Sequence, residues 1–181
     1  VLESDDVKFT ILACKKLGIK IIRIKPGEYK IFGKGLGSFA IKKNSELNFS
    51  NSGTASRLLL GALSTTPNIF VKIKGDHSLN RRNMKKLIDL LSKFGATFLP
   101  KGKDRFPLRM ISSKMPVGIE YKAGISAQLK SAAILAGLNC YGITKIEEQI
   151  SSRNHTENIL CKNKQAIQIQ KKNKKLITAV S

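Results

Sequence analysis

The chain has no tryptophan, only three cysteines and no uninterrupted run of 18 apolar residues. Because a membrane-spanning helix needs about 20 mostly apolar residues, the sequence predicts none. Cys14, Cys140 and Cys161 are too few and too scattered for a disulfide framework or a zinc site. We expect free, buried thiols in a cytoplasmic protein. The opening VLESDDVKF lacks the basic and apolar regions of a secretory signal, and its first residue is not Met, so we expect a chain entered midway.

Acidic residues are also scarce. The chain carries 12 Asp and Glu against 33 Lys and Arg, which gives a formal net charge of +21. Such a balance suits either a surface that binds a polyanion or a lysine-rich, solvated surface around a smaller anion site. Aromatic residues make up only 6%, so stacking platforms for single-stranded nucleic acid are few, and the lysines are spread along the whole chain. Composition therefore favours the second explanation.

One pattern occurs three times along the chain. A helical segment, often ending at glycine, is followed by two short strands around a polar turn. The copies begin at VKFTILACKKLG, SLNRRNMKKLIDLLSKFG and HTENILCKN, roughly 70 residues apart. Gly18 and Gly95 stand where a helix ends on a left-handed residue, and the lysine-rich KKNKK of the third copy suits a solvated hairpin turn. Further helices are expected at SGTASRLLLGAL and SAQLKSAAILAGL, and strands at NIFVKIKG, GIEYKAG and ITKIEEQ. This alternation predicts an α/β (α+β) domain of repeated units.

Two segments place polar residues and arginines where a loop enters a helix. In FSNSGTASRLLL, Asn51, Ser52 and Thr54 can cap the helix, Gly53 lets backbone N–H groups approach a ligand, and Arg57 lies one turn further on. The free N–H groups of such a helix start favour an anion.

In KGDHSLNRRNMKKL, Ser78 or Asn80 is the expected cap, which places Arg81 and Arg82 in the first turn. Cations there oppose the helix dipole, and such a broken rule often marks a functional site. A guanidinium suits a carboxylate or a phosphate.

Two more segments follow the same design. In AGISAQLKSAAILAGL, Ser126 and Gln128 open a helix that is otherwise small and apolar, so we expect it to be buried. In QISSRNHTENIL, Ser151, Ser152 and Arg153 precede a helix, and Asn154 or His155 followed by Glu157 resembles an N-terminal capping arrangement. Each segment alone is explained equally well by ordinary helix capping.

Taken together, SGTASRLLLGAL, KGDHSLNRRNMKKLIDLLSKFGA, GISAQLKSAAILAGLNCYGITKIEE and SSRNHTENIL resemble the EPSP synthase (3-phosphoshikimate 1-carboxyvinyltransferase) family in order and spacing. The resemblance covers nearly the whole chain. It implies one domain of an inside-out α/β barrel built of βαβαββ units. It also implies a reaction in which the 5-hydroxyl of shikimate 3-phosphate adds to C2 of phosphoenolpyruvate and phosphate is then eliminated. No metal or organic cofactor is implied. The full-length enzyme is expected to be a cytoplasmic monomer with no membrane or nucleic-acid partner.

The resemblance also assigns substrate contacts residue by residue. Those expected at shikimate 3-phosphate are Ser126, Ala127, Gln128, Ser152 and Arg153, and those expected at phosphoenolpyruvate are Asn51, Gly53, Arg82 and Gln128. Three positions depart from common family patterns, because Ala127 replaces a second serine, Asn83 a proline and Ser50 a glycine. The hydroxyl contact at Ala127 would be lost, although its backbone N–H remains able to donate.

The family's lysine–serine–arginine phosphate motif and its proton-transfer groups have no counterpart in this sequence. We therefore expect residues 1–181 to form a single truncated domain without the second catalytic domain, to contain no catalytic residue, and to be inactive alone.

Two other activities compete with this assignment. UDP-N-acetylglucosamine 1-carboxyvinyltransferases usually carry a reactive cysteine in the loop that corresponds to 75–78, where this chain has Gly-Asp-His-Ser. The second alternative is a basic RNA-binding domain similar to RNA 3′-phosphate cyclases. The net charge of +21 is compatible with it, and those cyclases use related repeat units.

Overall fold

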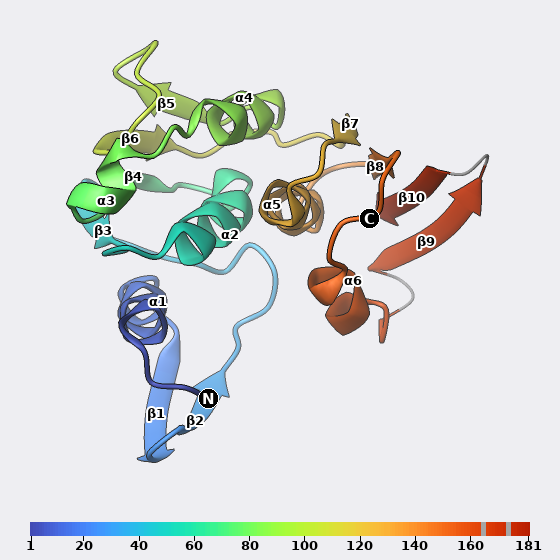
Figure 1. Cartoon of the computed structure of the whole chain (residues 1–181). Coiled ribbons are helices and arrows are strands. Elements are labelled where there is room, and N and C mark those ends of the chain that lie inside the picture. The colour runs from blue at the N-terminus through green and yellow to red at the C-terminus, as the bar shows by residue number, and fades with distance from the viewer. Residues whose placement is uncertain (164–165, 173–174) are drawn as a thin grey trace.

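The computed structural model describes residues 1–163, 166–172 and 175–181 (Figure 1). Helices and strands alternate along the chain, as the sequence predicts. The helices are α1 (Asp5–Lys16), α2 (Gly53–Ser64), α3 (His77–Arg81), α4 (Lys85–Lys93), α5 (Ala127–Gly137) and α6 (His155–Leu160). The strands are β1 (Lys20–Lys25), β2 (Glu28–Phe32), β3 (Ser45–Asn48), β4 (Phe70–Lys74), β5 (Thr97–Leu99), β6 (Leu108–Ile111), β7 (Glu120–Ala123), β8 (Thr144–Glu148), β9 (Ile167–Lys172) and β10 (Lys175–Val180).

Two four-stranded sheets repeat one topology. Their orders are β3-β4-β6-β5 and β7-β8-β10-β9. In each, the first two strands are parallel and are joined through a crossover helix, α2 or α5, while the remaining pairs are antiparallel. The β1–β2 hairpin follows α1 as β5–β6 follows α4 and β9–β10 follows α6. The repeated helix-and-hairpin pattern is therefore confirmed. Part of the predicted KKNKK turn, residues 173–174, lies outside the described residues.

Local rules explain some of the element boundaries. Gly18 and Gly95 have φ values of 86° and 94°, which confirms that each adopts the left-handed conformation that ends a helix. Strand β3 was not predicted, because SELN carries a single apolar residue, Leu47, and so shows no alternating pattern. Its pairing with β4 creates the strand, an effect of tertiary structure that sequence periodicity does not register.

The cysteines are all free, but they are not all buried. Cys14 and Cys140 are half-buried, and burial raises the pKa of both thiols, that of Cys140 to about 11. Cys161 is exposed, so the expectation of burial is wrong there. It is the C-cap residue of the short helix α6, and Asn158 and Ile159 in the last turn of that helix are also exposed. None of the helices in the described ranges is long and apolar enough to cross a membrane.

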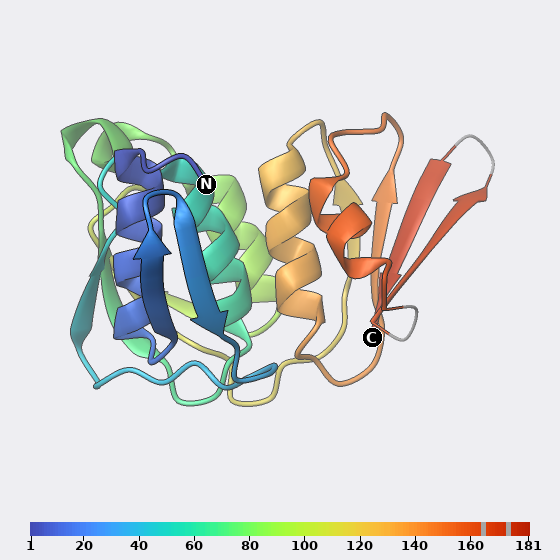
Figure 2. The same cartoon turned by 90° about the horizontal axis from the view of Figure 1, so that it is seen from below.

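Helices α2 and α5 run parallel and in direct contact (Figure 2). Gln128 Nε2 donates to Thr54 Oγ1 at the N-terminal ends, at 2.8 Å, and Thr65 Oγ1 donates to the Ala136 carbonyl at the C-terminal ends, at 3.1 Å. Between them, a Cβ on Gly61 would lie 2.5 Å from the carbonyl oxygen of Ala132. Only a glycine permits this approach, and the approach places the two helix N-termini side by side.

We predict that Gly61→Ala destabilises the chain by about 1–3 kcal/mol, because backbone atoms of Ala132 cannot move aside. The loss would exceed the gain of roughly 0.5–1 kcal/mol that alanine normally brings to a helix. Urea unfolding measures the difference. Gly33→Ala is the control, since a Cβ there meets nothing within 4 Å. Equal stability of the two variants would contradict the close helix contact.

A carboxylate near the start of the chain holds the β1–β2 hairpin. Glu3 accepts hydrogen bonds from Arg23 at 2.7 and 2.8 Å, from the backbone N–H of Gly27 at 2.9 Å and from Tyr29 Oη at 2.7 Å. Arg23 foremost, then Gly27 and Tyr29, hold the pKa of Glu3 at about 2, below its ordinary 4.5. Four donors thus fasten the segment before α1 to the hairpin that follows it.

This pKa predicts a pH dependence. A carboxyl whose folded-state pKa lies below its unfolded value stabilises the fold above the unfolded pKa, and that contribution is lost as the pH falls through the folded pKa. The contribution of Glu3 is therefore complete above a pH of about 4.5 and disappears toward pH 2. As the pH falls through this window, the thermal unfolding temperature of Glu3→Gln should therefore decrease less than that of the wild type. Identical pH profiles would contradict the prediction.

Candidate anion site at two helix N-termini

The start of α2 is built around Gly53. The Ser52 hydroxyl caps the helix by accepting from the Ala55 N–H at 3.2 Å, which confirms one of the expected caps. Arg57, one turn on, folds back so that Nη1 donates to the Gly53 carbonyl at 2.9 Å. A Cβ on Gly53 would lie 2.6 Å from Arg82 Nη1 and 2.7 Å from Arg57 Nη1. Two guanidinium groups therefore converge on a position that only glycine leaves open.

The two arginines carry like charges in close proximity. Arg82 Nη2 also donates to Asn51 Oδ1 at 2.5 Å, which fixes the guanidinium beside the helix start. Burial, and then the charge of Arg82, lower the pKa of Arg57 below its ordinary value. Two cations at the positive end of a helix dipole repel one another and the dipole. An anion placed between them would relieve both repulsions, so the geometry suits a carboxylate or a phosphate.

The expected position of the arginines in their own helix is wrong. The cap of α3 is Asp76, which accepts from the Leu79 N–H at 2.8 Å, and neither Ser78 nor Asn80 caps it. Arg81 therefore falls in the last turn and Arg82 is the C-cap residue. Cations at the C-terminal end of a helix interact favourably with the helix dipole instead of opposing it. Arg82 has an extended backbone (φ −70°, ψ 136°), and the contact with Asn51 shows that its side chain reaches back to α2.

The start of α5 lies beside that of α2. Ser126 caps α5 by accepting from the Leu129 N–H at 3.4 Å, and Ala127 is the first helical residue. Gln128 Nε2 donates to Thr54 Oγ1 on α2, so its side chain spans the two helix starts. Because the helices are parallel, their unpaired N–H groups face the same end of the molecule (Figure 2). The aligned dipoles add to the positive potential of Arg57 and Arg82.

The fourth segment is joined to α5 by a buried ion cluster that the sequence analysis missed. Ser152 donates from its backbone N–H and its Oγ to Glu148, and Glu148 pairs with Lys130 on α5. Glu157 does not cap α6; it is buried and pairs with the same lysine. A charged residue four positions after the Ser126 cap, inside an apolar run, was the available signal for this cluster.

The structure brings most of the expected site residues together. Asn51, Gly53 and Arg82 are in direct contact, and Gln128 joins them through Thr54. Ser126 and Ala127 occupy the same turn as Gln128, and Ser152 is linked to α5 through Glu148. Arg153 is exposed on the loop between β8 and α6. The described residues contain no group of three or more His, Cys, Asp and Glu side chains placed to hold a metal ion.

A separate cavity of about 600 Å³ lies between α1, α2, α5 and the loop at 35–39. Its walls are mainly apolar, with Leu58, Leu59 and Leu135 among them, and it meets the anion site only at Ser52 and Thr54. An apolar cavity of this kind is a poor environment for a doubly charged ligand. The helix starts, with their arginines and free N–H groups, suit an anion better than this cavity does.

The fold and the site define a mixed α/β protein of repeated units that gathers cations at paired helix N-termini. The family model for EPSP synthase (3-phosphoshikimate 1-carboxyvinyltransferase) matches residues 1–181. The chain is 38% identical over 161 residues to a 3-phosphoshikimate 1-carboxyvinyltransferase from Ruegeria sp., and 41% identical over 161 residues to one from Acidiphilium cryptum. Each match covers 88% of this chain and only 35% or 36% of the relative.

A solved EPSP synthase from Acinetobacter baumannii superposes with a TM-score of 0.84 at 32% identity, over 97% of this chain and 39% of that one. The chain belongs to the EPSP synthase family. Its fold is that expected of one domain of the inside-out α/β barrel. Neither of the two competing assignments, to UDP-N-acetylglucosamine transfer or to RNA binding, is favoured by these matches.

From the proximity of Arg57 and Arg82 we predict that anions stabilise the folded chain. Inorganic phosphate should raise the thermal unfolding temperature of the chain, relative to chloride at equal ionic strength, because it relieves the repulsion between Arg57 and Arg82. Arg82→Met should remove about half of that increase or more. Arg81→Met is the matched control, since it deletes the same charge from the adjacent, exposed position. An equal loss in both variants would show that net charge, and not this site, binds the anion.

Proposed function

We propose that this chain supplies one wall of a site at which the enolpyruvyl group of phosphoenolpyruvate is transferred to the 5-hydroxyl of shikimate 3-phosphate. The observation that carries the proposal is the convergence of Arg57 and Arg82 on Gly53, beside a glutamine that bridges two helix N-termini. The relatives that bear the name 3-phosphoshikimate 1-carboxyvinyltransferase support the choice of reaction. Because the chain covers 35% or 36% of their length, the whole reaction is proposed for the chain together with further polypeptide.

The physical problem of this reaction is to hold two phosphorylated carboxylates side by side. Fixed cations and helix N-termini lower the repulsion between the substrates before the reaction begins, and they require no reorganisation during it. Asn51, Gly53 and Arg82 are proposed to bind phosphoenolpyruvate at the start of α2. Gln128 is proposed to reach both substrates, which agrees with its contact across the two helices.

The proposed contacts of shikimate 3-phosphate are Ser126, Ala127, Gln128, Ser152 and Arg153. Ala127 has no hydroxyl, so only its backbone N–H, at the first position of α5, would donate. No residue of the chain is assigned to proton transfer, and no metal or cofactor enters the proposal. We place the reaction in the cytoplasm, in a monomeric enzyme without nucleic-acid or membrane partners.

We further propose that residues 1–181 belong to a single domain whose first repeat unit is incomplete. Within the described residues, the second and third units each have a crossover helix, and α1 with the β1–β2 hairpin has none. The apolar cavity beside α2 and α5 is large enough to accept side chains of another helix. Exposed apolar residues on the hairpin, including Ile22, Ile31 and Phe32, also suit a covered surface.

Calorimetric titration tests the substrate assignment. The chain should bind shikimate 3-phosphate and not shikimate, which lacks the phosphate. Gln128→Ala should weaken binding by about 10- to 100-fold, the usual worth of a hydrogen bond to a charged group. Gln170→Ala, an exposed glutamine on β9, is the control. Unchanged affinity in Gln128→Ala would exclude this site.

We also predict no turnover of the two substrates by residues 1–181 alone. A coupled assay for released phosphate measures it. Turnover above background would contradict the proposed division of the site between this chain and further polypeptide.

A further inference from the structure

Three charged side chains meet in the interior between α5, β8 and α6. Lys130, Glu148 and Glu157 are each at most 1% exposed. Lys130 Nζ lies 3.0 Å from Glu148 Oε2 and 2.5 Å from Glu157 Oε1. Lys130 is one turn beyond the cap of α5, and its N–H donates to the Ser126 carbonyl at 3.1 Å. The cluster therefore lies directly beneath the helix start that is proposed to bind phosphate.

Stability alone is a weak reason for such a cluster. Transferring three charges from water to the protein interior is costly, and apolar residues of similar volume often serve a core equally well. Most of the positions that follow on α5 are apolar, with Ala132, Ala133 and Ile134 all buried. What the charges add is a fixed direction for each contact.

The two carboxylates are bonded differently. Glu148 uses both oxygens: Oε2 pairs with Lys130, while Oε1 accepts from the Ser152 N–H at 3.0 Å and from the Ser152 Oγ at 2.7 Å. Glu157 approaches only Lys130, and neither of its oxygens accepts a hydrogen bond of ordinary geometry from the described residues. Glu148 thus connects the buried lysine to the loop at 149–154, and Glu157 does not.

The loop is fixed at both of its ends. Glu148 ends β8 and holds Ser152, and Thr156 Oγ1, in the first turn of α6, donates to Ser131 Oγ on α5 at 2.8 Å. Figure 2 shows the loop between β8 and α6 at the same end of the molecule as the start of α5. The contacts of Ser152 also limit its chemistry, because its only hydroxyl hydrogen is already donated to Glu148.

We propose that Lys130 and Glu148 are positioning residues that hold the loop at 149–154 against the N-terminus of α5, so that Arg153, and not the Ser152 hydroxyl, donates to the phosphate of shikimate 3-phosphate. The proposal rests on the proposed function, since it concerns the same substrate. It changes the role of Ser152 from a phosphate donor to a connection between the loop and the buried cluster.

Glu148→Gln and Glu157→Gln form a matched pair for the test. Each replacement removes one negative charge from the same cluster and preserves the side-chain volume. Glutamine at 148 has a single accepting oxygen, so it can accept from Lys130 or from Ser152 but not from both. Whichever of the two is left faces the amide NH₂ group, which is a donor. Glutamine at 157 keeps an oxygen near Lys130 but removes the ion pair, and it leaves the Glu148 contacts intact. Calorimetric titration gives the affinities, and urea unfolding gives the stabilities.

We expect Glu148→Gln to weaken shikimate 3-phosphate binding by about tenfold or more, and Glu157→Gln by less than about threefold. Phosphoenolpyruvate affinity, set by Arg82 on the α2 side, should stay unchanged in both. A cluster that only stabilises the fold predicts instead that binding follows stability equally in the two variants, and that result would overturn the proposal. A wild-type chain that binds no shikimate 3-phosphate would refute the proposed function, and the positioning role with it.

A second measurement needs no variant. Amide hydrogen exchange of the wild-type chain should show a protected Ser152 N–H between faster-exchanging Ser151 and Arg153, because only the Ser152 amide donates to Glu148. A Ser152 amide that exchanges as fast as its neighbours would overturn the positioning role. Arg153→Met should lower the affinity for shikimate 3-phosphate, whereas unchanged affinity would refute the assignment of the phosphate contact to Arg153.

Discussion

The close contact of α2 with α5 is the constraint on which the arrangement of the proposed site depends. Gly61 lets the backbone of one helix reach that of the other at Ala132, and hydrogen bonds at both ends keep the helices parallel and in register. Parallel helices in register present their free N–H groups at one end. Every proposed substrate contact except Arg82 and the loop at 149–154 belongs to one of these two helix starts. The proposed site for two anions thus depends on helix packing before any catalytic group is considered.

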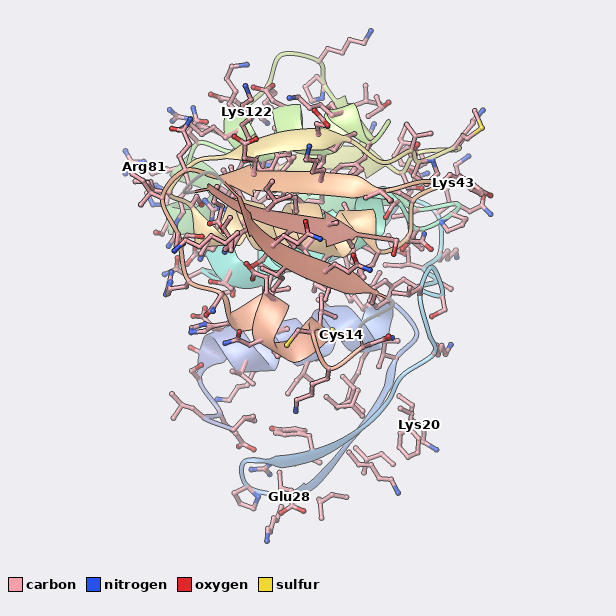
Figure 3. The ribbon with its side chains drawn as sticks, turned by 90° about the vertical axis from the view of Figure 1, so that its right-hand side faces the viewer. Cys14, Lys20, Glu28, Lys43, Arg81 and Lys122 are labelled. Atoms are coloured by element: carbon pink, nitrogen blue, oxygen red, sulfur yellow. The ribbon has the colours of Figure 1, made fainter. Side chains whose placement is uncertain are left out.

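The net charge of +21 contributes less to this site than its size suggests. Lysines and arginines are spread along the whole chain, and Figure 3 shows Arg81 and Lys43 on opposite sides of the view. Charges on an exposed surface are screened within about 10 Å at ordinary salt. Arg57 differs because it is half-buried beside Arg82, where the repulsion is screened less. The proposed anion site therefore depends on local arrangement more than on total charge.

Sequence reasoning predicted the repeated units, both crossover helices and the glycine helix ends, because each depends on periodicity or on local backbone preference. It misplaced Arg81 and Arg82, since the stronger cap, Asp76, begins α3 earlier than expected. It also missed Lys130 and assigned Glu157 to a cap. Residues 130, 148 and 157 are distant in sequence, and no local pattern indicates that they meet. Contacts that depend on how separate units pack were beyond the reach of the sequence alone.

The central claim is that the starts of α2 and α5 form one site for two anions. Backbone amide chemical shifts of the isotopically labelled chain, recorded during titration with shikimate 3-phosphate and then phosphoenolpyruvate, test it most directly. The account predicts that the amides of Gly53, Thr54, Ala127 and Gln128 shift together and saturate with the ligands. Shifts spread over the lysine-rich surface, with these four amides unchanged, would contradict it.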